Sequence, residues 1–147
     1  ESRLRQLPPH VDIDTAIINA VLEEGGKFCS EVLYPLNQVG DPYRYGAAGP
    51  NAFDCSGLVY YSYRRAGLTV PRTSSAQSAH ARRIAKGAIR SGDLMFFSSG
   101  YGVYHVGIFL RWRGGRAIML HSPQPGQRVR VEAAWTSDWF AGTLRAR

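Results

Sequence analysis

One cysteine of this sequence stands where its thiol could act as a nucleophile. Cys55 follows a long loop and begins a run of apolar residues at helical spacing, so the pattern places it at a helix N-terminus. A cysteine attacks as its thiolate, and a helix N-terminus or an adjacent imidazole stabilises that anion. Cys55 is therefore a candidate for covalent catalysis.

Two histidines are candidates for the partner of that thiol. His105 lies in a predicted central strand, Tyr104 to Leu110, where an apolar residue would be expected, and His121 ends the next predicted strand. In a hairpin that turns at Gly114 and Gly115, His105 opposes a position near 124, so a wide turn brings the two histidines within a diagonal of each other. Each histidine alone is also consistent with a satisfied core or edge residue.

Helices precede strands along the chain. The periodicity predicts helices over 13–22, 55–66 and 74–85, with another candidate over 28–36 that Pro35 interrupts. Strands are predicted over 93–97, 104–110, 116–121, 128–131 and near 142–144. This order indicates an α+β fold in which helices cover an antiparallel meander. We expect the helix that bears Cys55 to cover the sheet face on which His105 lies, opposite to Val106 and Ile108.

Length and composition are those of one domain. The chain has 147 residues, 44% of them apolar, which is enough for a core. We expect a monomeric single domain over 1–147, with 1–12 as an extended N-terminal segment. Since no run approaches the about 18 apolar residues of a membrane span, and the first residues lack the apolar stretch of a signal peptide, we expect a soluble chain.

The charge balance is basic, with a net charge of +7 from 18 basic and 11 acidic residues. No block of five or more like charges occurs, so a solvated surface is one interpretation, and attraction of an anionic polymer or an acidic substrate is another. Nucleic acid is a less favoured partner, because the arginines are scattered in pairs.

The cysteines Cys29 and Cys55 are too few for a disulfide scaffold. They form no Cys-x-x-Cys pair, and no His-x-x-x-His pair accompanies them, so we expect neither a metal nor another cofactor. We interpret Cys29 as a core thiol.

Five motifs occur in one order along the chain. They are Pro42-Tyr43-Arg44-Tyr45-Gly46, the segment Gly46 to Tyr60 with Asp54-Cys55-Ser56-Gly57 inside it, Pro71 to Gln77, Gly92 to Phe97, and His105-Val106-Gly107-Ile108. In this order, with 50 positions from Cys55 to His105 and 16 from there to His121, they resemble the NlpC and p-sixty family of cell-wall peptidases. The resemblance covers roughly Ile13 to Val131. Ala47 and Ala48 depart from it, since the family often has a second glycine there.

This resemblance implies a circularly permuted papain-like fold, with N-terminal helices packed on a central antiparallel β-sheet. It also implies that Cys55 is the nucleophile, His105 the base and His121 the residue that orients the base. The other residues that we assign to oxyanion or substrate binding are Tyr43, Asp54, Ser56, Arg72 and Ser74.

Three of these assignments have an ordinary structural alternative. Tyr43 would place its hydroxyl near the nucleophile, or is a packed loop aromatic. Asp54 would face the substrate beside Ser56, or is the helix N-cap. Arg72 would pair with a substrate carboxylate, or is a solvated surface arginine.

The reaction implied by the resemblance is hydrolysis of peptidoglycan stem peptides between γ-D-glutamate and the diamino acid, either diaminopimelate or lysine. Such an enzyme would act in the cell envelope or after secretion, and anionic cell-wall polymer is a further candidate partner for the basic surface. An N-acetylmuramoyl-L-alanine amidase and an acyltransferase would use the same three residues. A non-catalytic module that binds cell wall or nucleic acid is the alternative from another class.

Overall fold

The computed structural model describes residues 38–145. Its elements are the helices α4 (Cys55–Arg65) and α5 (Ser74–His80), a short 3₁₀ helix (Lys86–Ala88), and the strands β1 (Arg82–Ile84), β2 (Leu94–Ser99), β3 (Gly102–Arg113), β4 (Arg116–His121), β5 (Arg130–Ala133) and β6 (Trp139–Thr143). The helices predicted over 13–22 and 28–36, the segment 1–12 and Cys29 lie outside the described residues.

Helix α4 begins where the sequence predicts it. Asp54 is its N-cap, with extended backbone, and its carboxylate accepts a hydrogen bond from the backbone N–H of Gly57. After the C-cap residue Ala66, Gly67 adopts the left-handed conformation that terminates many helices.

The helix predicted over 74–85 is shorter than expected. Thr73 caps its N-terminus, but Ala81 is extended, and helix α5 ends at His80. The next residues, 82–84, form strand β1, which pairs with β6 at the edge of the sheet. Ladder hydrogen bonds with β6 thus replace the helical bonds that local periodicity favoured.

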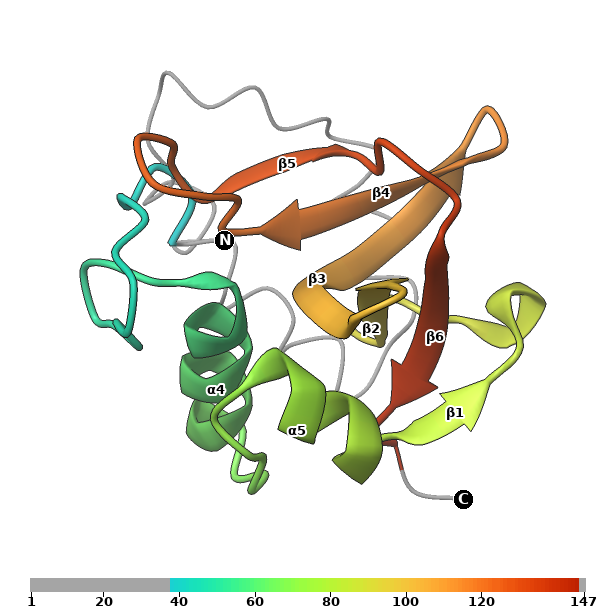
Figure 1. Cartoon of the computed structure of the whole chain (residues 1–147), viewed down its shortest axis with the longest axis horizontal. Helices are drawn as coiled ribbons and strands as arrows, with labels where there is room; N and C mark the ends of the chain where they lie inside the picture. Colours follow the sequence, from blue (N-terminus) through green and yellow to red (C-terminus); the bar gives the residue numbers. More distant parts are fainter. Residues whose placement is uncertain (1–37, 146–147) are drawn as a thin grey trace.

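The sheet has six strands in the order β1-β6-β2-β3-β4-β5, with antiparallel pairing throughout (Figure 1). The run β2-β3-β4-β5 is the predicted meander. The last strand corrects that prediction, because β6 returns to pair with β2 and β1. The fold is α+β, as the sequence indicates, and Figure 1 shows α4 and α5 together along one side of the sheet.

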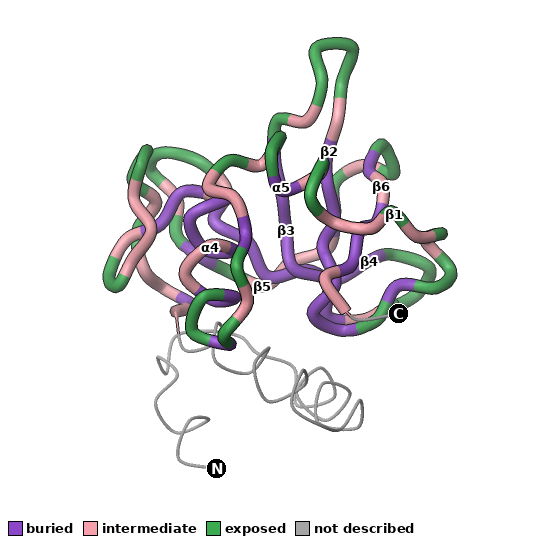
Figure 2. The backbone as a smooth tube through the Cα atoms, turned by 90° about the horizontal axis from the view of Figure 1, so that it is seen from below, coloured by how far each residue is buried: buried purple, intermediate pink, exposed green. Residues whose placement is uncertain are grey.

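Two apolar clusters lie on the two faces of the sheet. Helix α4 contributes Leu58 and Val59 to the first cluster, which includes Val106 and Ile108 of β3. The second cluster includes Phe97 of β2, and His105 opposes Phe97 on that face. Figure 2 shows how buried residues follow the central strands and the inner side of α4.

This arrangement corrects one expectation. Helix α4 covers the face of Val106 and Ile108, whereas His105 lies on the opposite face. Cys55, at the N-terminus of α4, therefore approaches β3 from the other side of the sheet.

Within residues 38–145, no helix is both long enough and apolar enough to cross a membrane.

Candidate active site

Cys55 is half-buried at the first turn of α4, beside the backbone of β3. Its thiol lies within hydrogen-bonding reach of the backbone N–H of Val106 and of the N–H groups of Cys55 and Ser56. The contact with Val106 brings the thiol to the residue that follows His105. The two N–H groups at the start of the helix are donors of the kind that stabilise an oxyanion.

A register shift between β3 and β4 brings the two histidines to one face. Near the turn, Arg113 pairs with Arg116, but beyond a shift at Leu110 the pairing moves by one position, to Ile108 with Leu120. Without this shift His105 and His121 would point to opposite faces of the sheet. With it they share a face and lie diagonally across the two strands.

The histidines form one chain of hydrogen bonds with a carboxylate. Nε2 of His105 and Nδ1 of His121 share a hydrogen bond of 2.8 Å. Nε2 of His121 lies 2.6 Å from Oε2 of Glu132, which also accepts a hydrogen bond of 2.9 Å from Nε of Arg130. Since Nε2 of His105 is engaged with His121, Nδ1 is the ring nitrogen of His105 that remains.

Burial decides the charge state of the site. Desolvation raises the pKa of the Cys55 thiol, more than the N–H of Val106 lowers it. Desolvation, followed by the neighbouring His121, lowers the pKa of His105 from 6.5 to about 3. Both shifts favour a neutral thiol and a neutral imidazole over a thiolate and an imidazolium.

The pKa of Glu132 moves in the opposite direction to that of a desolvated acid. The hydrogen bond from His121 lowers this pKa to about 2, and the hydrogen bond from Arg130 adds to the effect. Glu132 is thus ionised at neutral pH.

Tyr43 lies near the nucleophile. Burial raises the pKa of its hydroxyl, and the nearby Cys55 and Asp54 raise it further. The side chain is half-buried in the loop that precedes α4, where Tyr43 also bridges to Phe53.

Asp54, Ser56 and Arg72 form a network behind the nucleophile. Arg72 donates 2.9 Å to Oγ of Ser56 through Nη1, and 3.0 Å to Oδ2 of Asp54 and 3.3 Å to the carbonyl of Ala47 through Nη2. Asp54 also accepts from the N–H of Gly46 at 2.9 Å and from that of Gly57 at 2.7 Å. The structure thus shows Asp54 as the N-cap, and Arg72 as a clamp on the nucleophile loop.

Ser74 is placed apart from this network. It is half-buried at the start of α5, and the side chains that line the cavity at His105 do not include it. Its assignment to substrate binding has no contact that favours it.

Three residues next to the site were not predicted from the sequence. The buried Ser122, next to His121, donates 2.7 Å to the carbonyl of Phe53 and so ties the end of β4 to the nucleophile loop. Trp135 stacks on Phe97 and lies against both histidine rings. Glu132 could have been found from alternation, because it opposes Met119 on β4, two residues before His121.

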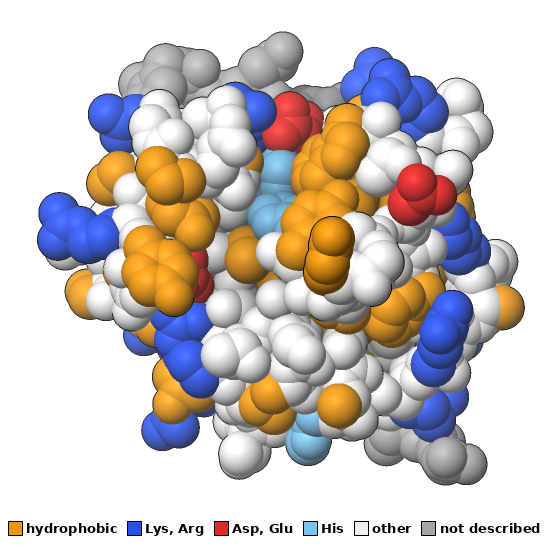
Figure 3. All heavy atoms as spheres, in the orientation of Figure 1, with side chains coloured by type: hydrophobic (Ala, Val, Ile, Leu, Met, Phe, Trp, Pro, Cys, Tyr) orange, Lys and Arg blue, Asp and Glu red, His pale blue; other side chains and the backbone are white. Residues whose placement is uncertain are grey.

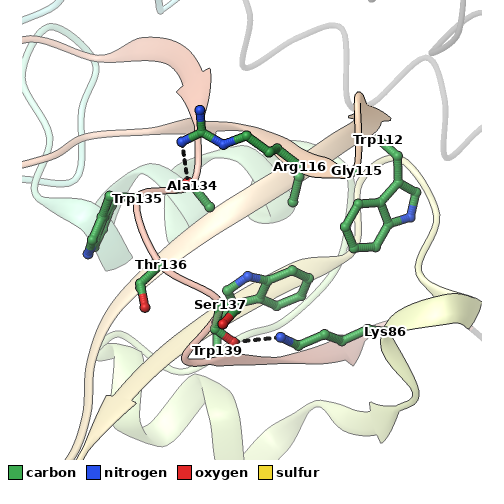
Figure 4. Close-up of a pocket in the computed structure, with 10 residues that line it drawn as sticks. Lys86, Trp112, Gly115, Arg116, Ala134, Trp135, Thr136, Ser137 and Trp139 are labelled. Atoms are coloured by element: carbon green, nitrogen blue, oxygen red, sulfur yellow. Dashed lines mark hydrogen bonds between the residues drawn. The ribbon is translucent and has the colours of Figure 1, made fainter.

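A cavity of about 340 Å³ opens at the histidines, and its lining includes His105, His121, Glu132 and Trp135. On the face shown in Figure 3, histidine surface lies in a hollow flanked by hydrophobic side chains. Trp135 also lines a second cavity of about 300 Å³. Figure 4 shows that cavity between Trp112, Trp135 and Trp139, with Lys86 beside Trp139 and Arg116 directed at the carbonyl of Ala134.

The site thus contains a helix-borne thiol at the backbone N–H of Val106, the residue after His105, and a hydrogen-bonded pair of histidines on β3 and β4. Residues 40–147 match the model of the NlpC/P60 family, and this chain belongs to that family.

Similarity to individual proteins supports the family membership. The chain is 39% identical over 101 residues to the probable endopeptidase p60 of Listeria monocytogenes, which covers 69% of this chain and 20% of that protein. It therefore spans only a fifth of the length of that relative. The NlpC/p60 domain of the peptidoglycan hydrolase SagA is 31% identical, with a TM-score of 0.64 over 86% of this chain and 98% of that one.

The same fold also serves a protein without catalysis. RipD of Mycobacterium tuberculosis, a non-catalytic NlpC/p60 domain protein adapted to peptidoglycan binding, is 24% identical, with a TM-score of 0.63 over 88% of this chain and 98% of that one. The fold alone therefore does not decide between hydrolysis and binding, and the site residues must decide it.

Proposed function

We propose that this chain is a cysteine peptidase that cuts peptidoglycan stem peptides between γ-D-glutamate and the diamino acid, either diaminopimelate or lysine. The observation that carries the proposal is a helix-terminal thiol that accepts from the backbone N–H of Val106, the residue after His105, together with the hydrogen bond between His105 and His121. Family membership supplies the substrate class, since SagA, a member with a similar structure, is a peptidoglycan hydrolase.

The reaction begins from the neutral pair. As Sγ of Cys55 attacks the amide carbonyl, its proton moves to Nδ1 of His105, and a carbon–sulfur bond forms. His105 then donates this proton to the leaving amine, which breaks the carbon–nitrogen bond and leaves an acyl-enzyme. Water, deprotonated by His105, releases the acyl group and restores the thiol.

The oxyanion of the tetrahedral intermediate needs donors that are fixed before the reaction. The candidates are the backbone N–H groups of Cys55 and Ser56, which lie within hydrogen-bonding reach of the thiol, and the hydroxyl of the nearby Tyr43. His121 holds the ring of His105 through the 2.8 Å hydrogen bond.

The place of action follows from the substrate. Because peptidoglycan lies outside the cytoplasmic membrane, we place the activity in the cell envelope or after secretion. The basic surface, with a net charge of +7, would assist binding to anionic cell-wall polymer.

The test is mass spectrometry of sacculi after digestion. Sacculi of the diaminopimelate type and of the lysine type are treated with wild type, Cys55→Ala and Cys29→Ala. We expect fragments cut after γ-D-glutamate from wild type and Cys29→Ala, and none from Cys55→Ala. The sacculus that is cut identifies the diamino acid.

Two other products would overturn the proposal in different ways. Intact stem peptides freed from muramic acid would show an amidase. Binding to sacculi without any released fragment, unchanged in Cys55→Ala, would show a binding module like RipD.

A further inference from the structure

Beyond the histidine pair lies a carboxylate whose position bears on the chemistry of the thiol. Glu132 of β5 opposes Met119 of β4, so its side chain shares a face with His121, two residues further along β4. Oε2 of Glu132 lies 2.6 Å from Nε2 of His121, whose side chain is only 1% exposed.

When both imidazoles are neutral, the direction of each hydrogen bond follows from what its partners can donate. An ionised carboxylate can only accept, so the proton of this bond must reside on Nε2 of His121. With one ring proton, His121 then has a lone pair on Nδ1, and Nε2 of His105 must be the donor of the 2.8 Å bond between the rings. His105, carrying its own proton on Nε2, has a lone pair on Nδ1.

A hydrogen bond in the opposite direction, from His121 to His105, would leave His105 unable to act as a base. If His121 carried protons on both nitrogens, its Nδ1 would donate to Nε2 of His105, and a neutral His105 would hold its proton on Nδ1. That nitrogen could not accept the proton of Cys55. The tautomers of the two rings thus decide whether His105 can act as a base.

We infer that Glu132 is a positioning residue that sets the tautomers of both histidines, so that His105 offers an unprotonated Nδ1 to Cys55. This role rests on the proposed thiol mechanism. Arg130 supports it, because its Nε donates 2.9 Å to the same oxygen of Glu132 and keeps the carboxylate in place. Trp135 stacks on His121 with the ring planes 30° apart and restricts the imidazole from the side.

The experiment combines the tautomers with kinetics. Histidine in the full chain is labelled for nitrogen NMR, which separates protonated from unprotonated ring nitrogens at neutral pH. Wild type, Glu132→Ala and Glu132→Gln are compared, and turnover is measured on a soluble stem peptide. Asp138→Asn is the matched control, since Asp138 is an exposed carboxylate outside the cavity lining.

We expect both rings of wild type to carry their proton on Nε2. In Glu132→Ala the acceptor is lost, the tautomers of His121 become mixed, and kcat falls by about 10- to 100-fold while KM stays within about twofold. In Glu132→Gln the amide oxygen still accepts from Nε2 of His121, so the wild-type tautomers and most of kcat are retained. Asp138→Asn should match wild type in every readout.

Three results would overturn the inference. They are a proton on Nδ1 of His121 in wild type, unchanged tautomers in Glu132→Ala, and a raised KM with unchanged kcat, which would make Glu132 a substrate contact. The NMR spectra require no substrate, so they separate this inference from the proposed function. If the tautomers depend on Glu132 but the chain cuts no peptide, the positioning role of Glu132 is retained and the proposed peptidase function is refuted.

Discussion

At the scale of single residues, the protonation of Cys55 decides how the reaction begins. Burial raises the pKa of this thiol above its ordinary value, which favours the protonated form at neutral pH. In a Cys29→Ser chain, alkylation of Cys55 by iodoacetamide should therefore rise with pH until beyond pH 9. A rate that is already at its plateau near neutral pH would show a thiolate–imidazolium pair instead.

Arg72 tests whether the clamp behind the nucleophile matters. Its two terminal nitrogens serve Ser56, Asp54 and Ala47, a set that one ammonium cannot reach. We expect Arg72→Lys to lower the free energy of unfolding by about 1–2 kcal/mol and to reduce turnover. Thermal unfolding and peptide hydrolysis measure both effects, with Arg90→Lys, an exposed arginine elsewhere, as the control. If Arg72→Lys and Arg90→Lys have the same stability and the same rate of hydrolysis, Arg72 does not hold the nucleophile loop in place.

At the scale of elements, the first turn of α4 accepts no side chain at Gly57. A Cβ there would overlap the backbone carbonyl of Ala47 and lie 2.8 Å from Oδ1 of Asp54. We expect Gly57→Ala to displace the nucleophile loop, with a loss of about 1–3 kcal/mol in the free energy of unfolding and reduced hydrolysis. Gly87→Ala, where a Cβ meets nothing within 4 Å, should be neutral in chemical denaturation and activity. If Gly57→Ala behaves like Gly87→Ala, the close approach is not needed.

Local pattern predicts the elements better than it predicts their pairing. The helix at Cys55 and strand β4 follow from apolar spacing and turn residues, and both occur where the sequence places them. The shift at Leu110 depends on how two strands meet and has no signature in either strand, although it decides that His105 and His121 share a face.

The pairing of β6 with β2 likewise depends on tertiary packing and has no signature in the local sequence. The family motifs contain Cys55 and His105, and their spacing extends to His121, but nothing in them leads to Glu132. The strand predicted over 128–131 stops one residue short of it, whereas β5 is Arg130–Ala133.

At the scale of the whole molecule, the buried site links stability to pH. In the unfolded chain His105 becomes protonated below about pH 6.5, whereas in the folded chain its pKa is about 3. The unfolded state therefore binds more protons between these pH values. The free energy of unfolding therefore decreases as the pH is lowered, by about 1.4 kcal/mol per pH unit well below pH 6.5. Glu132, whose pKa falls from 4.5 to about 2, acts in the same direction at lower pH.

Urea unfolding at a series of pH values checks this sign. We expect the free energy of unfolding of wild type to decrease from pH 6.5 to pH 4.5 by roughly 2–3 kcal/mol, and that of His105→Gln to decrease less. A wild-type stability that is flat over this window would contradict the buried neutral imidazole.

The measurement that bears most directly on the thiol mechanism is the capture of the acyl-enzyme. A reaction with stem peptide is quenched in acid during turnover, and peptide mapping by mass spectrometry locates any added mass. We predict an adduct with the mass of the N-terminal substrate fragment on the peptide that contains Cys55, present in Cys29→Ser and absent from Cys55→Ser. Continued hydrolysis by Cys55→Ser, without an adduct on Cys55 in wild type, would contradict a covalent mechanism at this thiol.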